Sequence, residues 1–210
     1  MAIEFYVFYI AVLIFSVVIH EVSHGTIANR LGDPTAKFAG RLTLNPIKHL
    51  DLWGSIILPV FLILVRSPIL FGWAKPVPYN PYNLKNQKWG PAMVAAAGPA
   101  SNLLLAVFFG LIIRLAGAFD QSGFFGLLAG YFQIIVFLNL TLAIFNLLPI
   151  PPLDGSKVLF AALPYSYEHI RVFLEQYGLV ILLFVLFFGG NFIFPVIRFL
   201  FQIITGTDIF

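Results

Sequence analysis

Three ionisable residues in the middle of an apolar chain constrain this sequence most strongly. His20, Glu21 and His24 fall within five positions, directly after residues 5–19, which are apolar apart from Ser16. A charged side chain such as Asp or Lys costs about 2.5–3.5 kcal/mol at the centre of a transmembrane helix. Three such groups together need a compensating partner, and a divalent cation can supply one.

Composition agrees with a chain that lies largely in a membrane. Of the 210 residues, 60% are hydrophobic and 10% are charged, whereas about a quarter of the residues in a soluble domain are charged. We therefore predict an all-α integral membrane protein, a polytopic bundle of about 4–6 transmembrane segments in a single domain over residues 1–210. Loop Lys and Arg that set topology explain the net charge of +3, so no nucleic-acid partner is expected.

Breaks in the apolar pattern divide the chain into segments. A core over about residues 5–163 is followed by a polar loop over 165–176 and a C-terminal helical segment over 178–204. Gly189-Gly190-Asn191 allows that last segment to be one kinked helix or two half-helices. The full spans predicted within the core are residues 5–30, 92–116 and 124–148.

Two segments between the first and second spans are predicted to stay on one side of the membrane. The apolar run 52–65 is short and contains Pro59, which favours a re-entrant segment. Residues 35–45 partly alternate polar and apolar side chains around Gly40, which favours a small membrane-surface β-hairpin. The free edge of that hairpin could pair with an extended substrate by strand addition, or the hairpin could simply connect two elements.

His20-Glu21-Val22-Ser23-His24 is an H-E-x-x-H motif on a predicted helix. Its spacing of four places both imidazoles on one helical face, where both can bind one zinc ion. Glu21 then lies beside the open coordination position, as a general base toward a metal-bound water. The alternative is a hydrogen-bonded polar cluster between helices.

Asp154 is the best candidate for a third metal ligand. The chain has no cysteine, so ligands must be His, carboxylate or water. Asp154 follows a proline-rich stretch at the end of a predicted span, and Gly155 after it lets the backbone turn freely. Asp154 could instead cap the short helix that follows. We favour metal binding because two histidines leave zinc without a third protein ligand.

Taken together, these motifs resemble those of the site-2 proteases, a family of intramembrane zinc metalloproteases. The resemblance implies His20, His24 and Asp154 as zinc ligands and Glu21 as the general base. The chain has no PDZ insert, as in the small prokaryotic branch of that family. The segments that carry the resemblance are His20-Glu21-Val22-Ser23-His24-Gly25, Gly40-Arg41-Leu42-Thr43-Leu44-Asn45-Pro46, Gly98-Pro99-Ala100-Ser101-Asn102 and Asn146-Leu147-Leu148-Pro149-Ile150-Pro151-Pro152-Leu153-Asp154-Gly155.

The resemblance also implies that Asn102 and Asn146 line the site, where they could hold the substrate or the oxyanion. Interpreted without the family, an Asn within a span more often bonds across helices for packing. Both interpretations stay open for Asn102.

The implied activity is cleavage of single-span transmembrane protein substrates within the lipid bilayer. One alternative is a catalytically idle homologue that binds membrane proteins as a chaperone, and another is a metal transporter. An intact Glu21 argues against the idle binder. The convergence of polar groups on one point, rather than along a path, argues against the transporter. The sequence does not predict the oligomeric state.

Topology provides an independent argument for the same site. An even number of crossings must separate His24 from Asp154 if they are to meet at one depth, and spans 92–116 and 124–148 supply two. Eight of the twelve Lys and Arg residues lie between Arg30 and Lys88. By the positive-inside rule, we expect a multi-pass cell-membrane protein with its N-terminus outside and its active site toward the cytoplasmic half.

Overall fold

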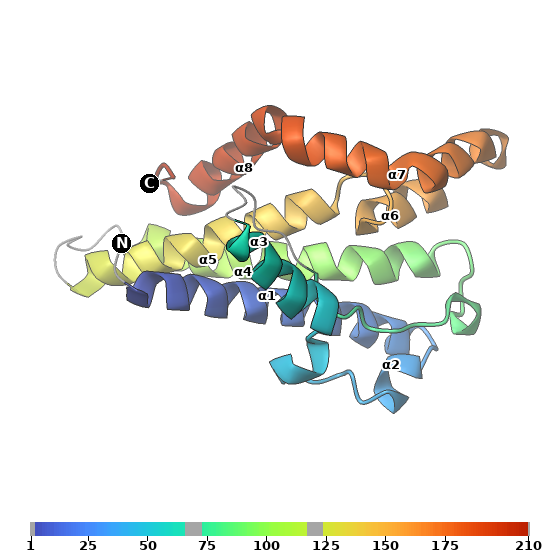
Figure 1. The fold of residues 1–210 in the computed structure, drawn as a ribbon, viewed down its shortest axis with the longest axis horizontal. Coiled ribbons are helices and arrows are strands. Elements are labelled where there is room, and N and C mark those ends of the chain that lie inside the picture. The colour runs from blue at the N-terminus through green and yellow to red at the C-terminus, as the bar shows by residue number, and fades with distance from the viewer. Residues whose placement is uncertain (1–2, 66–72, 117–123, 210) are drawn as a thin grey trace.

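A computed structural model describes residues 3–65, 73–116 and 124–209, and every regular element in these ranges is helical (Figure 1). The prediction of an all-α protein is therefore confirmed. The long helices are α1 (Ile3–Arg30), α4 (Gly90–Ala116), α5 (Phe124–Asn146) and α7 (Glu168–Phe188). The short helices are α2 (Thr35–Phe38), η1 (Pro46–His49), η2 (Leu52–Ile57), α3 (Leu58–Leu64), η3 (Pro81–Asn83), α6 (Asp154–Ala162), η4 (Tyr165–Tyr167) and α8 (Gly190–Thr205).

Four helical segments in the described residues are long and apolar enough to cross a bilayer: α1, α4, α5 and the continuous stretch of η4 and α7. Large apolar side chains point outward from all of them, and Leu104 of α4 and Leu179 of α7 are among the most exposed. A water-soluble chain would bury such side chains. The outer surface is therefore suited to lipid.

Helix α4 lies at the centre of the bundle and packs against α1, α5, α6 and α8. In Figure 1, α1, α4 and α5 run side by side, and α7 and α8 form a second layer above them. Small buried residues at the start of α4, such as Ala92 and Ala95, are typical of close helix packing in membranes. Further along α4, Ala106 belongs to one buried apolar cluster with Val136 of α5 and Phe201 of α8.

The predicted β-hairpin over residues 35–45 is wrong, because no strand occurs in the described residues. Backbone hydrogen bonds close locally there instead: Phe38 N–H donates to the Pro34 carbonyl and Ala39 N–H to the Thr35 carbonyl. These bonds build the single turn of α2. Gly40, with a φ of 63°, then redirects the chain. Without a strand there is no free edge, so the strand-addition hypothesis loses its basis.

Two further predictions need revision. Residues 52–64 form η2 and α3 in direct succession, and this arrangement does not support the predicted re-entrant segment. The predicted polar loop over 165–176 is largely helical, because α7 already begins at Glu168. Of the two alternatives for residues 178–204, the structure has two helices, which meet at Gly189.

Candidate metal centre

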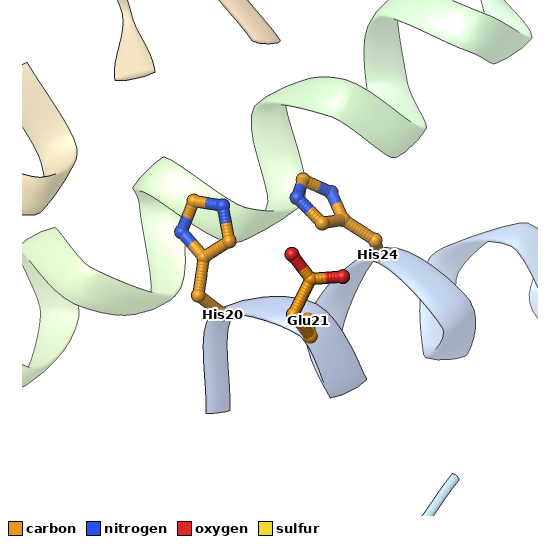
Figure 2. A group of neighbouring side chains, drawn as sticks. All are labelled: His20, Glu21 and His24. Carbon is orange, nitrogen blue, oxygen red and sulfur yellow. The ribbon is translucent and has the colours of Figure 1, made fainter. Parts of the chain in front are cut away.

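The two histidines of the H-E-x-x-H motif lie on the inner face of α1. Both are buried, at 6% and 9% exposure, and their ring centroids are 4.6 Å apart. Figure 2 shows both rings pointing from α1 toward α4, with the Glu21 side chain rising from the same helix turn. One nitrogen of each ring and a carboxylate oxygen of Glu21 lie within 4.8 Å of one another. The motif therefore presents three possible ligand atoms to one small volume.

Asp154 reaches the same volume from the start of α6. Its Oδ2 atom lies 3.1 Å from His20 Nε2 and 3.2 Å from His24 Nε2. The capping interpretation finds no support, because Leu153 occupies the N-cap position and no side chain caps α6. Lys157 Nζ lies 3.6 Å from the other carboxylate oxygen, Oδ1. The carboxylate thus has one oxygen toward the histidines and the other toward Lys157.

Gly155 is required for a reason other than the predicted backbone freedom. A Cβ atom at this position would lie 2.2 Å from the Leu147 carbonyl oxygen. Any side chain would therefore push α6 away from the end of α5. The glycine lets Asp154 approach the histidines by allowing close packing.

Each histidine presents Nδ1 to a hydrogen-bond acceptor. His20 Nδ1 lies 2.6 Å from Asn102 Oδ1, and His24 Nδ1 lies 2.7 Å from the Val94 carbonyl oxygen, both on α4. A proton on Nδ1 leaves a lone pair on Nε2, which is the tautomer that binds a metal. Both Nε2 atoms then face Asp154 as acceptors.

Gly98 of α4 provides the space that a cation would need. A Cβ atom at this position would lie 2.5 Å from both His20 Nε2 and His24 Nε2. Two imidazole lone pairs and a carboxylate oxygen repel one another unless a positive charge lies among them. The donor set, two nitrogens and one oxygen with room for another ligand, fits a tetrahedral zinc ion with one open position.

Glu21 lies at the mouth of this arrangement. Its Oε2 atom accepts a hydrogen bond of 2.8 Å from the backbone N–H of Val77. Within the described residues, no group donates to Oε1, so this oxygen can take a proton. The two histidines, Glu21 and Asp154 line a cavity of about 230 Å³ together with Pro76, Val77, Tyr79, Val94, Asn146, Pro152, Leu153 and Lys157.

The two asparagines named from the sequence lie in different surroundings. Asn102 is fully buried and bonds across helices to His20 and Asn139, which are the contacts of the packing interpretation. Asn146 lines the cavity, while its Nδ2 donates to the Leu142 carbonyl one turn back on α5. Only Asn146 therefore offers its side chain to the cavity directly.

The loop that carries Val77 is fastened by Asp33, a fully buried carboxylate beyond the end of α1. Burial alone would raise the pKa of Asp33, but hydrogen bonds from Thr35, Asn83 and the backbone N–H of Asn80 outweigh burial and lower it below its ordinary value. The bond from Asn80 N–H measures 2.6 Å and that from Asn83 Nδ2 measures 2.9 Å. A charged Asp33 therefore holds this loop against α1.

Four contributors to the site escaped prediction from the sequence. The Val94 carbonyl and the Val77 N–H are backbone groups, which carry no signal in the residue type. The role of Gly98 depends on the absence of a side chain. Asn139 did carry a signal, because it is an amide in the middle of α5 with apolar residues directly on both sides.

In this bundle of apolar helices, two imidazoles, a carboxylate and a nearby glutamate point into one internal cavity. This arrangement defines a class of protein, the membrane proteins with a buried cluster of potential metal ligands. The comparison with known families is more specific. The chain belongs to peptidase family M50, whose model matches residues 8–126 and 118–189, and it is a multi-pass membrane protein. No solved structure matches it.

Curated relatives agree with this assignment. The chain is 41% identical to the Bacillus subtilis protein named "Putative zinc metalloprotease YwhC" over 191 residues, which cover 89% of this chain and 84% of the relative. It is 34% identical to "Putative zinc metalloprotease Rip2" of Mycolicibacterium smegmatis over 84% of this chain and 65% of the relative. An archaeal relative from Methanocaldococcus jannaschii, "Putative zinc metalloprotease MJ0611", is 32% identical over 68% of this chain and 63% of the relative.

Proposed function

We propose that this protein is a zinc-dependent endopeptidase that cleaves transmembrane protein substrates within or close to the bilayer. One observation carries the proposal: His20 Nε2, His24 Nε2 and Asp154 Oδ2 converge beside Glu21 in a single cavity. The relatives are named as zinc metalloproteases, which supports zinc as the metal. We assign the two histidines and Asp154 as its ligands.

When bound, zinc acts as a Lewis acid and lowers the pKa of a coordinated water to about 7. Glu21 is the general base of the proposed reaction. Its Oε1 takes the proton from the attacking water and delivers it to the leaving amine of the cleaved peptide bond. The Val77 N–H holds Oε2 and so keeps the carboxylate pointed into the cavity.

The helical form of a transmembrane segment bears on how it could be cleaved. In an α-helix the peptide carbonyls and N–H groups bond to one another and are surrounded by side chains. A transmembrane substrate must therefore unwind locally before one of its peptide bonds can reach the cavity beside Glu21. Single-span membrane proteins with Gly or Pro near the cut are the class of substrate that meets this requirement at the lowest cost.

The orientation in the membrane is part of the same proposal. Arg30 closes the His24 end of α1 and Lys37 follows it in α2, while Lys157 of α6 lies 3.6 Å from Asp154 at the site itself. The positive-inside rule then supports a cytoplasmic position for this end of the bundle and an external N-terminus.

Replacing Glu21 by Gln tests the proposed chemistry. Glutamine keeps the size of the side chain and an oxygen for the Val77 N–H, but it cannot accept the proton. We expect zinc content to be unchanged and cleavage of a model single-span substrate in detergent to fall about 10²–10⁴-fold. Glu4→Gln, near the exposed start of α1, is the matched control and should retain activity. Cleavage by Glu21→Gln at a rate near that of the wild type would refute the assignment.

A further inference from the structure

His20 is the first member of a buried chain of polar side chains that ends inside α5. Beyond the bond between His20 Nδ1 and Asn102 Oδ1, Asn102 Nδ2 donates to Asn139 Oδ1 at 2.8 Å. Asn139 Nδ2 in turn donates to Ser16 Oγ and to the Ile135 carbonyl, both at 2.9 Å. Asn102 and Asn139 are both 0% exposed. These hydrogen bonds therefore link three helices, and the two amides among them have no contact with solvent.

A single backbone group fixes the donor and the acceptor in each of these hydrogen bonds from Asn139 to His20. The Ile135 carbonyl can only accept, so the amide of Asn139 must turn its NH₂ toward it and its oxygen toward Asn102. Asn102 must then donate to Asn139 and present its own oxygen to His20. An oxygen facing His20 Nδ1 requires a proton on that nitrogen.

We propose that Asn139 is a positioning residue that, through Asn102, holds the proton of His20 on Nδ1 and keeps Nε2 free for the metal. This inference rests on the proposed function only in taking His20 as a zinc ligand. Asn139 touches neither His20 nor the cavity in the described part of the chain. It acts solely by setting which end of the Asn102 amide faces the imidazole.

Asp154 favours the opposite tautomer of His20. Asp154 Oδ2 lies 3.1 Å from His20 Nε2, so a carboxylate next to this nitrogen favours a proton on it. If the Asn102 amide turned over, its NH₂ would face Nδ1 and the ring proton would move to Nε2, in a hydrogen bond to Asp154. That arrangement blocks the nitrogen that must bind the metal.

Without Asn139, little holds the Asn102 amide in place. Its only other acceptor within hydrogen-bond distance in the described residues is the Ser16 carbonyl, 3.4 Å from Nδ2. A bond of that length is weak. Removing the Asn139 oxygen should therefore let both orientations of Asn102 be populated.

Zinc affinity of the purified full-length chain, measured by competition with a chelator in detergent, gives the first test. Asn139→Leu should lower the affinity about tenfold, within the range found for outer-shell partners of metal-binding histidines. In an Asn102→Asp background, the carboxylate accepts from Nδ1–H in either orientation, so Asn139→Leu should cost less than threefold. This non-additivity is the signature of an amide orientation. An equal loss in both backgrounds would mean that Asn139 is merely structural and would overturn the proposal.

The position of the ring proton gives a second test that needs no zinc. The chain has four histidines, so ¹⁵N spectra of the metal-free protein can assign His20 by comparison with His20→Gln. We expect a proton on Nδ1 in the wild type and a population without it in Asn139→Leu. Absence of the Nδ1 proton in the wild type would overturn the proposal, even if Asn139→Leu did not fold. If the wild type bound no zinc, the proposed function would fail while this measurement still tested the amide chain.

Two further variants separate positioning from general loss of a buried polar group. A neutral aspartic acid keeps an oxygen that can accept from Asn102 Nδ2 and one O–H that can donate to the Ile135 carbonyl, and it lacks only the second donor of the amide. Asn139→Asp should therefore keep the Nδ1 proton and the zinc affinity that Asn139→Leu loses. Thr205→Val removes the hydroxyl of a residue that is 2% exposed and that bonds to the Phe201 carbonyl and to Thr207, and it should change neither. Failure of Asn139→Asp to keep them, or an equal effect of Thr205→Val, would count against the proposal.

Discussion

His20 and His24 lie one helical turn apart, yet two regions of α4 hold them through different kinds of group. The region around His20 is a network of side chains, in which the amide of Asn102 receives the ring. The region around His24 is main chain, because the Val94 carbonyl receives its ring. A single substitution can remove the Asn102 amide that receives His20. The Val94 carbonyl that receives His24 persists whatever side chain position 94 carries. The two halves of one site therefore differ in how easily they can be damaged.

The largest effect should come from the position that both halves share. Gly98→Ala places a methyl group about 2.5 Å from both Nε2 atoms, where the metal would lie. We expect zinc affinity to fall at least about 100-fold, since both histidine contacts are obstructed together. The helix itself should be retained, because Ala is the better helix former by about 1 kcal/mol.

Gly130→Ala is the matched control for that experiment. A Cβ atom at Gly130 of α5 meets nothing within 4 Å, so this variant should keep both zinc and thermal stability. Unchanged zinc affinity in Gly98→Ala would mean that the metal lies elsewhere.

A pair of substitutions tests the contrast between the two regions directly. Asn102→Leu removes the acceptor of His20 Nδ1–H and should lower zinc affinity about 10–100-fold. Val94→Ala leaves the carbonyl that holds His24 in place, so zinc affinity should change less than about threefold, although the lost methyl groups cost roughly 1–2 kcal/mol of stability. Chelator competition and thermal unfolding on the same samples separate the two effects. Equal losses of affinity would remove the distinction between side-chain and main-chain support.

The smallest effect on the metal should come from Asp33, which holds the loop over Glu21 rather than a ligand. The pKa of Asp33 is lower in the folded protein than its unfolded value of about 3.9. Its contribution is therefore fully present above about pH 4 and is lost as pH falls through the folded pKa. Asp33→Asn should cost roughly 1–2 kcal/mol at pH 7, with the difference from the wild type shrinking at acidic pH and zinc affinity unchanged.

Asp51→Asn provides the control. Among the residues that the structure describes, the carboxylate of Asp51 accepts one hydrogen bond, from Gly54 N–H, whereas that of Asp33 accepts four. Asp51→Asn should destabilise the protein less than Asp33→Asn. A pH-independent loss of stability in Asp33→Asn would show that the charge of Asp33 does not hold the loop.

The sequence predicted the long helices well because a bilayer imposes one rule on them. About twenty apolar residues must form a helix that satisfies its own backbone, and α1, α4 and α5 follow this rule closely. The surface segments follow no such rule. Residues 35–45 have the alternation of a strand, but local bonds to the Pro34 and Thr35 carbonyls are available sooner than a distant partner strand. The helical start of α7 was missed because its polar residues, such as Arg171 and Glu175, pair with each other along the helix surface.

Within the site, residue type revealed the groups that act through side chains. His20, Glu21, His24 and Asp154 were all named from the motifs, and the structure places them around one cavity. The groups that act through the backbone or through the absence of a side chain could not be named this way. Asn139 lies between these cases, because an amide in the middle of an apolar helix is visible in the sequence but its hydrogen-bond partner is not.

The central claim is that two histidines and an aspartate from distant parts of the chain hold one zinc ion. Elemental analysis of the purified wild type, His24→Ala and Asp154→Ala tests it most directly. The account predicts one zinc per chain in the wild type and a sharp loss in both variants, since each removes one of three protein ligands. Full zinc content in His24→Ala or Asp154→Ala would contradict it.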